Sequence, residues 1–237
     1  MKELTGLILM AVLGTYYFCR KKTDRKKALF CKAAATSVPG ILLAVSMIEG
    51  NVQNVSAGGN GTGLTVAAGA TLAAIVFYMA ADVLLECRFI LGAVCFSIGH
   101  VWMTAGFFLS REAALYSDGH VDAGFLLSAS GAFIVFIAAA VAALHRYFHQ
   151  LKQKKLFYPM LGYIAVLGIM ASLAAASGIR TGGAPGAAAA AGGICFAVSD
   201  ILLGRNRLGK RRSRVRGAAV LILYYLAVYL FALRFWI

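Results

Sequence analysis

Two carboxyl side chains lie in stretches that are otherwise apolar. Asp82 occurs in FYMAADVLLECR and Asp200 in FAVSDILLGR, and the residues around each would form an apolar helix. Each lies about one helical turn from the basic end of its segment, a depth of roughly 5 Å. A carboxylate at that depth in a membrane costs about 2–3 kcal/mol, and less near the interface, so both residues require an explanation.

The two carboxyls have a structural and a chemical interpretation. In the first, each pairs with a nearby arginine, Arg88 or Arg205. In the second, two helices bring Asp82 and Asp200 to one cavity. Two carboxyls close together in an apolar setting do not both ionise readily, because burial and like charge disfavour the charged form. One acid and one carboxylate would remain, and such a pair can perform acid/base catalysis, which is the arrangement that we expect.

A histidine lies near the middle of another apolar stretch. His100, in CFSIGHVWMTAGF, has Ser97 and Thr104 on the same helical face. A lone histidine of this kind often forms hydrogen bonds between helices. Alternatively, it could line the upper part of the cavity of the carboxyls. At roughly 17 Å from the basic end of its helix, it is expected to lie well above both carboxyls.

A lysine and two tyrosines are further candidates. Lys32 begins an apolar segment at its basic end and could bind a phosphate, or simply extend to the interface. Tyr224 and Tyr225 lie about two turns into the last segment, so their hydroxyls could reach the depth of the carboxyls. Packing within an aromatic belt is the alternative for both tyrosines.

No metal site or cofactor motif is expected. His145 and His149 have the spacing of metal ligands but lack the glutamate of HExxH. The stretch SDGHVD is interpreted as an ordinary polar loop. The glycine-rich SAGGNGTG lacks the lysine and hydroxyl residue of a phosphate-binding loop. The five cysteines form no CxxC pair and suggest no disulfide framework.

Long apolar segments must position these residues. Of the 237 residues, 61% are hydrophobic and 14% charged, against about 25% charged in soluble domains. Each run of about 20 apolar residues can cross a bilayer. We therefore predict an all-α, polytopic transmembrane bundle that forms one domain over residues 1–237. Its eight helices are expected near 4–19, 29–49, 64–85, 89–110, 122–144, 156–177, 185–204 and 217–237.

The positive charge is concentrated on one side of this bundle. Of the 23 Lys and Arg residues, 19 fall in the loops near 20–32, 86–88, 145–155 and 205–216. The positive-inside rule orients these loops to the cytoplasm and both termini to the outside. Anionic lipid accounts for the net charge of +14, so membrane lipids, and not nucleic acid, are the expected partners. In a bacterium the membrane would be the plasma membrane.

The two halves of the chain share one feature. Asp82 and Asp200 occupy similar places in the third and seventh predicted helices, whereas the surrounding residues show only weak similarity. A duplicated four-helix unit is therefore conceivable.

Two stretches resemble the YhhN/lysoplasmalogenase family of eight-helix membrane proteins. They are ADVLLECRFILGAVCFSIGH and GGICFAVSDILLGRNR, and YPMLGYIAVLGIM and YYLAVYL are also similar, so the resemblance covers most of the chain. The residues that match the family patterns are Asp82, Gly92, Phe96, His100, Gly193, Phe196, Ser199 and Asp200. The chain departs from those patterns at Ala81, Ala33 and Val228, where Gly, Pro and Gln are usual.

The resemblance implies an enzyme that hydrolyses the vinyl ether bond of lysoplasmalogens. The products would be a fatty aldehyde and glycerophosphocholine or glycerophosphoethanolamine. Asp82 and Asp200 would be the catalytic pair, with no metal or cofactor. The residues that we expect to contact the lysophospholipid are Lys32, His100, Ser199, Tyr224 and Tyr225.

Two other function classes would also carry intramembrane carboxyls. One is a proton-coupled transporter, in which Asp82 and Asp200 form a proton relay. The other is a non-catalytic, lipid-binding membrane protein. The broken helices of transporters are not expected, because the sequence places Pro39, Pro159 and Pro185 near helix ends or in first turns.

Overall fold

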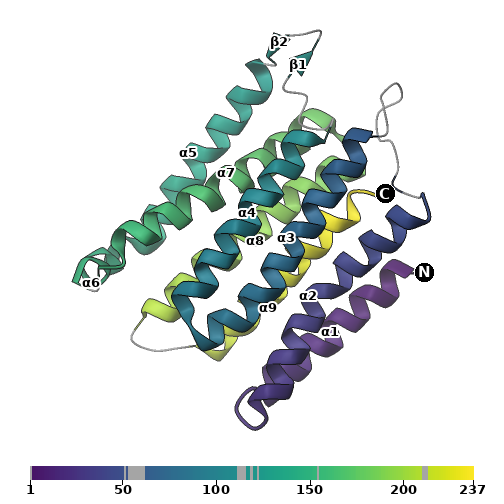
Figure 1. Ribbon diagram of the computed structural model, residues 1–237. Helices are drawn as coiled ribbons and strands as arrows, with labels where there is room; N and C mark the ends of the chain where they lie inside the picture. Colours follow the sequence, from purple (N-terminus) through teal and green to yellow (C-terminus); the bar gives the residue numbers. More distant parts are fainter. Residues whose placement is uncertain are drawn as a thin grey trace.

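Each of the eight predicted apolar segments forms a long α-helix in the computed structural model of the chain (Figure 1). The predicted all-α bundle of eight helices is thereby confirmed. The long helices are α1 (Lys2–Arg20), α2 (Arg25–Ile48), α3 (Thr62–Cys87), α4 (Phe89–Leu109), α5 (Ala123–Leu144), α7 (Phe157–Thr181), α8 (Gly183–Leu208) and α9 (Arg214–Leu233). A 3₁₀ turn and the short helix α6 follow α5, and they are His145–Tyr147 and Phe148–Gln153.

The structure describes most of the chain, namely residues 2–50, 52, 62–110, 116–117, 120–121, 123–153, 155–209 and 213–237. The only strands within these ranges are the two-residue β1 (Tyr116–Ser117) and β2 (His120–Val121), which pair antiparallel. The loop SDGHVD, interpreted above as an ordinary polar loop, contributes β2, but its residues 118, 119 and 122 lie outside the described ranges.

The long helices have the length and the outward surface of an integral membrane protein. Seven of them are long and apolar enough to cross a bilayer, and α1 contributes a shorter apolar span, Leu4–Arg20. Large apolar side chains such as Leu127, Ile134 and Val135 on α5 are exposed on the outside of the bundle. Apolar surface of this kind is stable against lipid chains and costly in water.

Local sequence determines where several helices begin. The Asp24 carboxylate accepts a hydrogen bond from the Lys27 backbone N–H at the start of α2. The Ser213 hydroxyl does the same for the Arg216 N–H at the start of α9. Such caps satisfy backbone donors that have no partner within the helix. Gly182 adopts a φ of 63° between α7 and α8, in the left-handed region that favours glycine.

The proline positions differ from the prediction at one residue. Pro159 and Pro185 lie in the first turns of α7 and α8, as expected. Pro39 lies inside α2, although the sequence placed it near a helix end. The prediction was wrong because Pro39 lies 14 residues after the first residue of α2 and nine before the last. The helix is nevertheless continuous through Pro39, so no broken helix results.

The helices pack as two four-helix units with the same internal order. In the first unit α1 packs on the outside of α2, followed by α3 and α4; in the second, α5 packs on α7, followed by α8 and α9. The units meet where α4 packs against α7 and α9 against α2, which closes a ring of six helices. Because α3 and α8 run in the same direction (Figure 1), the units are related like parallel repeats.

The two ends of the bundle differ in charge. Both termini lie at one end, and the connections α1–α2 and α3–α4, the last turn of α8, the first turn of α9 and α6 lie at the other (Figure 1). This second end carries the basic segments of the sequence. Which end faces the cytoplasm stays a prediction.

Candidate active site: two buried carboxyl groups

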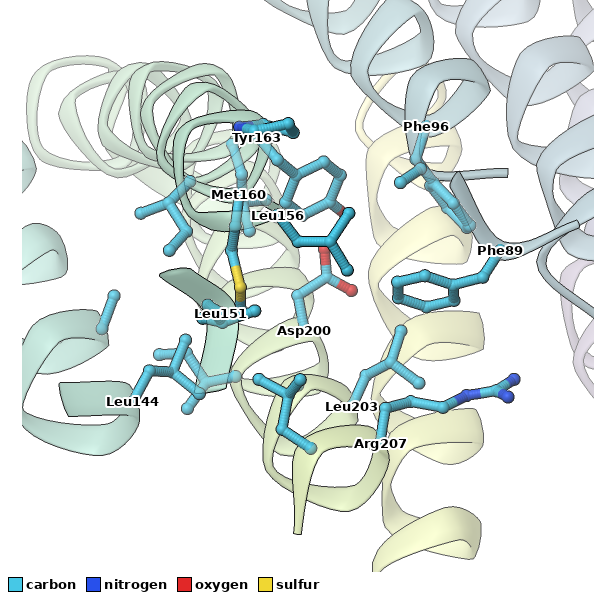
Figure 2. Close-up of a pocket in the computed structure, with 18 of the residues that line it drawn as sticks. Phe89, Phe96, Leu144, Leu151, Leu156, Met160, Tyr163, Asp200, Leu203 and Arg207 are labelled. Carbon is cyan, nitrogen blue, oxygen red and sulfur yellow. The ribbon is translucent and has the colours of Figure 1, made fainter. Parts of the chain in front are cut away.

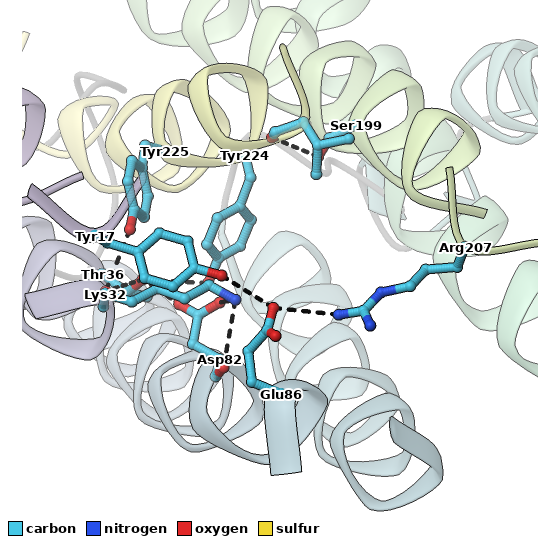
Figure 3. Close-up of polar contacts among 10 residues, drawn as sticks. Tyr17, Lys32, Thr36, Asp82, Glu86, Ser199, Arg207, Tyr224 and Tyr225 are labelled. Carbon is cyan, nitrogen blue, oxygen red and sulfur yellow. Dashed lines mark hydrogen bonds and ion pairs between the residues drawn. The ribbon is translucent and has the colours of Figure 1, made fainter. Parts of the chain in front are cut away.

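Asp82 on α3 is buried and its charge is neutralised. Its Oδ1 lies 3.1 Å from the Nζ of Lys32 on α2. The Thr36 hydroxyl, one turn further along α2, donates a short hydrogen bond to the same carboxylate. From α9, the Tyr224 hydroxyl donates at 3.1 Å (Figure 3). One cation and two hydroxyls therefore satisfy Asp82, as a buried carboxylate requires.

Lys32 connects this cluster to a second acidic residue. Its Nζ lies 5.3 Å from the centre of the Tyr17 ring. The Tyr17 hydroxyl donates to Glu86 at 2.9 Å, and an Arg207 nitrogen lies 3.2 Å from the same oxygen of Glu86 (Figure 3). The chain of contacts runs from α2 through α1 and α3 to α8.

A basic cavity opens beside these residues. It has a volume of about 840 Å³, and its lining includes residues of the α1–α2 connection, the last turn of α3 and the start of α9. Its charged lining residues are Lys21, Lys22, Arg25, Lys32, Glu86, Arg207 and Arg214. Phosphate binding by Lys32 stays a prediction. The Lys32 side chain lines this cavity, where it could contact a phosphate.

Asp200 on α8 has different partners. The hydroxyl of Tyr163 on α7 donates a short hydrogen bond to its carboxyl group. The Nε2 of His100 on α4 lies 4.0 Å from the same oxygen. Among the described residues, no lysine or arginine lies within ion-pair distance of Asp200. Its position resembles that of Asp82, but it lacks a permanently charged partner.

His100 is part of this second cluster, which corrects the predicted depth. The sequence placed it well above the carboxyls, yet it approaches Asp200 directly. The prediction failed because α8 continues to Leu208. Asp200 consequently lies eight residues, or about 12 Å, from the end of its helix instead of one turn.

The hydrogen bonds around His100 form a chain with one consistent direction. Because the Tyr163 hydroxyl gives its proton to Asp200, its oxygen accepts from His100 Nε2, 3.4 Å away. His100 Nδ1 then accepts from the Tyr78 hydroxyl at 2.9 Å. Gly99 leaves room for Tyr78, since a Cβ at Gly99 would come within 2.5 Å of the Tyr78 ring. The chain assigns His100 the tautomer with a proton on Nε2.

Asp200 lines a second cavity, which is apolar. This cavity has a volume of about 150 Å³, and Asp200 and Arg207 are its only charged lining residues among those described. Phe89, Leu151 and Met160 are among its apolar walls, and the Asp200 carboxyl points between Tyr163 and Leu203 (Figure 2). Arg207 and Leu203 also line the basic cavity, so the two cavities adjoin.

Aromatic rings separate the two carboxyls. The Phe196 ring lies 4.8 Å from His100 on one side and 5.5 Å from Tyr224 on the other. Phe96 also contacts Tyr224, at 5.6 Å. Among the described residues, neither of these two cavities includes Asp82 in its lining, so neither brings Asp82 and Asp200 together, and a cavity shared by both carboxyls stays a prediction. Helix periodicity does not determine the rotation that turns them toward different neighbours.

Two of the residues predicted to contact the lipid, Ser199 and Tyr225, form hydrogen bonds between helices. The Ser199 hydroxyl donates to the Val220 carbonyl at 2.9 Å and ties α8 to α9. The Tyr225 hydroxyl donates to the Lys32 carbonyl at 3.4 Å. Neither residue lines the apolar or the basic cavity. The sequence also allowed Asp82 to pair with Arg88, but in the structure Asp82 pairs with Lys32.

Several partners of the candidate residues were not predicted from the sequence. They are Tyr17, Thr36, Tyr78, Glu86, Tyr163 and Arg207. Thr36 lies four residues after Lys32, and Tyr78 lies four residues before Asp82. A spacing of four places Thr36 on the helix face of Lys32, and Tyr78 on the helix face of Asp82. This shared face was the signal in the sequence that could have identified them. Nothing in the chain around Tyr163 marks its hydroxyl as the partner of Asp200.

No metal centre is evident in the described ranges, where no three His, Cys, Asp or Glu side chains gather as potential ligands.

The sequence model of the YhhN family matches residues 31–235. No curated protein and no solved structure matches the chain.

Proposed function

Because the chain belongs to the YhhN family, we propose that it is a membrane hydrolase that cleaves the vinyl ether bond of lysoplasmalogens. The observation that supports this most strongly is the adjacency of two unlike cavities. One is apolar and contains the carboxyl group of Asp200, and the other is basic; both are lined by Leu203 and Arg207. A single-chain lipid with a phosphate head group has this division of polarity.

The lipid would lie across both cavities. Its phosphate would meet the cations of the basic cavity, and its first chain carbons would enter the apolar cavity beside Asp200. An apolar cavity of about 150 Å³ can hold a six-carbon ring, which is enough for the reacting end of an alkenyl chain. The remaining chain would extend along the exposed apolar surface between the helices.

Asp200 would supply the proton. In this proposal it is neutral before the reaction, since an ionised carboxylate without a strong cationic partner is costly in an apolar cavity. It protonates the β-carbon of the vinyl ether, and the double bond shifts to give an oxocarbenium ion with its positive charge shared between the α-carbon and the ether oxygen. The Asp200 carboxylate that remains stabilises this cation.

The same carboxylate would complete the reaction. Water adds to the α-carbon and gives one proton to Asp200, which restores the acid and leaves a hemiacetal. The hemiacetal loses its bond to the glycerol oxygen, which takes the hydroxyl proton, and a fatty aldehyde is released. One water is consumed, and one carboxyl group acts first as acid and then as base, as a carboxyl can in glycoside hydrolysis.

Asp82 would have a supporting role in this scheme. It holds the Lys32 ammonium at the wall of the basic cavity, where the ammonium can bind the phosphate. The predicted mechanism with two aspartates acting together on the bond has no geometric support, because aromatic rings separate the carboxyls. Lys32 and Asp82 are therefore proposed as binding and positioning residues.

Product analysis with three matched lipids tests the proposed function. The purified protein is incubated in detergent with 1-alkenyl, 1-alkyl and 1-acyl lysolipids that carry the same head group. Release of fatty aldehyde from the 1-alkenyl lipid alone is expected, since only a vinyl ether gives an oxocarbenium ion on protonation. Fatty acid from the 1-acyl lipid would indicate an esterase. Absence of any product would favour a transporter or a non-catalytic lipid-binding protein.

A further inference from the structure

The basic cavity contains far more positive than negative charge. Six of its lining residues are lysines or arginines, and Glu86 is its only acidic lining residue within the described part of the chain. Partial burial, offset in part by Glu86, lowers the pKa of Lys21, and repulsion from Lys32, Arg207 and Lys22 adds to the shift. Cations so crowded are stabilised when an anion binds between them.

The acidic and aromatic groups that could receive a cationic head group, among the described lining residues, already have partners within the protein. Glu86 accepts a hydrogen bond from the Tyr17 hydroxyl and pairs with Arg207 at 3.2 Å. The two aromatic faces in the cavity are those of Tyr17 and Phe18. The Lys21 ammonium lies 5.5 Å from the centre of the first ring and 5.0 Å from the centre of the second. A choline or ethanolamine ammonium would have to compete with the protein's own cations at these sites.

The cavity is more specific than a basic loop that attracts any anionic surface. Lys32 is buried, with 7% of its surface exposed, and the Asp82 carboxylate fixes its position from behind. Arg207 is held by Glu86, and its guanidinium lies 5.6 Å from the centre of the Phe89 ring. Two cations on different helices are thus fixed on the cavity wall before any ligand binds, which reduces the ordering cost of binding.

We propose that the basic cavity selects lysolipids with a phosphate monoester head group over those with a zwitterionic phosphocholine or phosphoethanolamine head group. The position of the lipid rests on the proposed function, but selectivity for the head group does not depend on hydrolysis. The shared chemistry is a phosphate ester with no attached cation, in place of the phosphocholine or phosphoethanolamine head group that the family resemblance implied.

Binding of non-hydrolysable lipids tests this selectivity separately from catalysis. The full chain is purified in a zwitterionic detergent, and 1-alkyl lysolipids of one chain length are titrated with phosphate, phosphoethanolamine or phosphocholine as the head group. We expect the monoester to bind about tenfold more tightly, since one additional charge-assisted contact has an effect of this order. Glycerol 3-phosphate and inorganic phosphate are titrated as competitors, to separate a lipid head group from a soluble phosphate as the natural source.

A matched pair of variants shows whether the cavity is responsible. The double variant Lys22→Gln/Arg214→Gln removes two exposed charges that line the cavity. The control double variant, Arg20→Gln/Lys26→Gln, also removes two exposed charges, and neither of these residues lines the cavity. The double variant should reduce the preference for the monoester, because two of the six lining cations are lost while Lys32 and Arg207 remain, and the control should keep it.

Each outcome bears on the proposal. Equal affinity for all three head groups, or tighter binding of phosphocholine, would overturn it. It would also be overturned if the control variant lost the preference as fully as the double variant, because general surface charge would then suffice. Monoester selectivity in a protein that releases no aldehyde would support this inference while rejecting the proposed reaction.

Discussion

Asp82 and Asp200 occupy equivalent places in the two four-helix units but have different surroundings. Each lies on the third helix of its unit and precedes a similar run, Val-Leu-Leu or Ile-Leu-Leu. Each has partners from the second helix of its own unit, two for Asp82 and one for Asp200, and one partner from the fourth helix of the other unit. In the first unit the partners include the Lys32 ammonium. In the second they are the Tyr163 hydroxyl and the His100 imidazole.

This difference indicates how one arrangement can serve two purposes. A carboxylate neutralised by lysine holds the lysine in place and has no proton to give. A carboxyl beside a phenol, a neutral imidazole and an apolar cavity can carry a proton to a substrate. The aromatic pair Phe96 and Phe196 separates the two sites. We infer that the first site fixes the head group and the second performs the chemistry.

The largest effect on stability is expected at Asp82. Asp82→Asn leaves the Lys32 ammonium without its counter-charge, which costs about 3 kcal/mol, at the lower end for a buried pair because Lys32 also reaches the basic cavity. Thermal unfolding in detergent should show Tm lower by roughly 10 °C. The equivalent change, Asp200→Asn, should leave Tm unchanged or raise it. Equal Tm losses would show that both carboxyls are structural ion-pair partners.

Replacing both members of the pair should reverse that loss. Asp82→Leu/Lys32→Met substitutes apolar side chains for a buried ion pair, which is often neutral or stabilising by about 1–4 kcal/mol. Thermal unfolding should therefore return to within a few degrees of the wild type. Because the cationic side chain is lost from the basic cavity, KM should rise while kcat changes little. A double variant as unstable as Asp82→Asn would show that Thr36 and Tyr224 depend on the carboxylate.

A smaller effect on turnover is expected from Tyr78. Tyr78→Phe removes the hydroxyl that donates to His100 Nδ1 and keeps the ring packing. His100 can then adopt either tautomer, and kcat should fall by about tenfold with KM unchanged, less than for loss of a general acid. The pH dependence of kcat should also shift, which loss of packing alone would not produce. An unchanged pH profile would remove Tyr78 from the hydrogen-bonded chain.

The smallest effect is expected at Ser199, one residue before Asp200. Ser199→Ala removes the hydrogen bond to the Val220 carbonyl, worth about 1 kcal/mol, and Tm should fall by a few degrees. Neither kcat nor KM should change, because the side chain lines neither cavity. A raised KM would restore Ser199 as the substrate contact that the family resemblance implied.

The fold could be predicted from the sequence more completely than the candidate site. Runs of apolar residues predicted eight helices, and the depth of two carboxyls drew attention to Asp82 and Asp200. The rotation of each helix, which decides what a side chain faces, leaves no signal in a segment that is apolar on every side. Helix α8 extends four residues beyond its predicted end. Asp200 therefore lies deeper than expected, at the depth of His100. Tyr163 and Thr36 are ordinary members of such helices and become partners only through packing.

One comparison tests the division of roles most directly. The rate of aldehyde release at saturating 1-alkenyl lysolipid is measured for Asp200→Asn and for the double variant Asp82→Leu/Lys32→Met. We predict that Asp200→Asn loses at least about 10²-fold in kcat, as expected for loss of a general acid, while the double variant keeps kcat within about tenfold of the wild type. A folded double variant that loses kcat as completely as Asp200→Asn would contradict the account, because both carboxyls would then act on the bond.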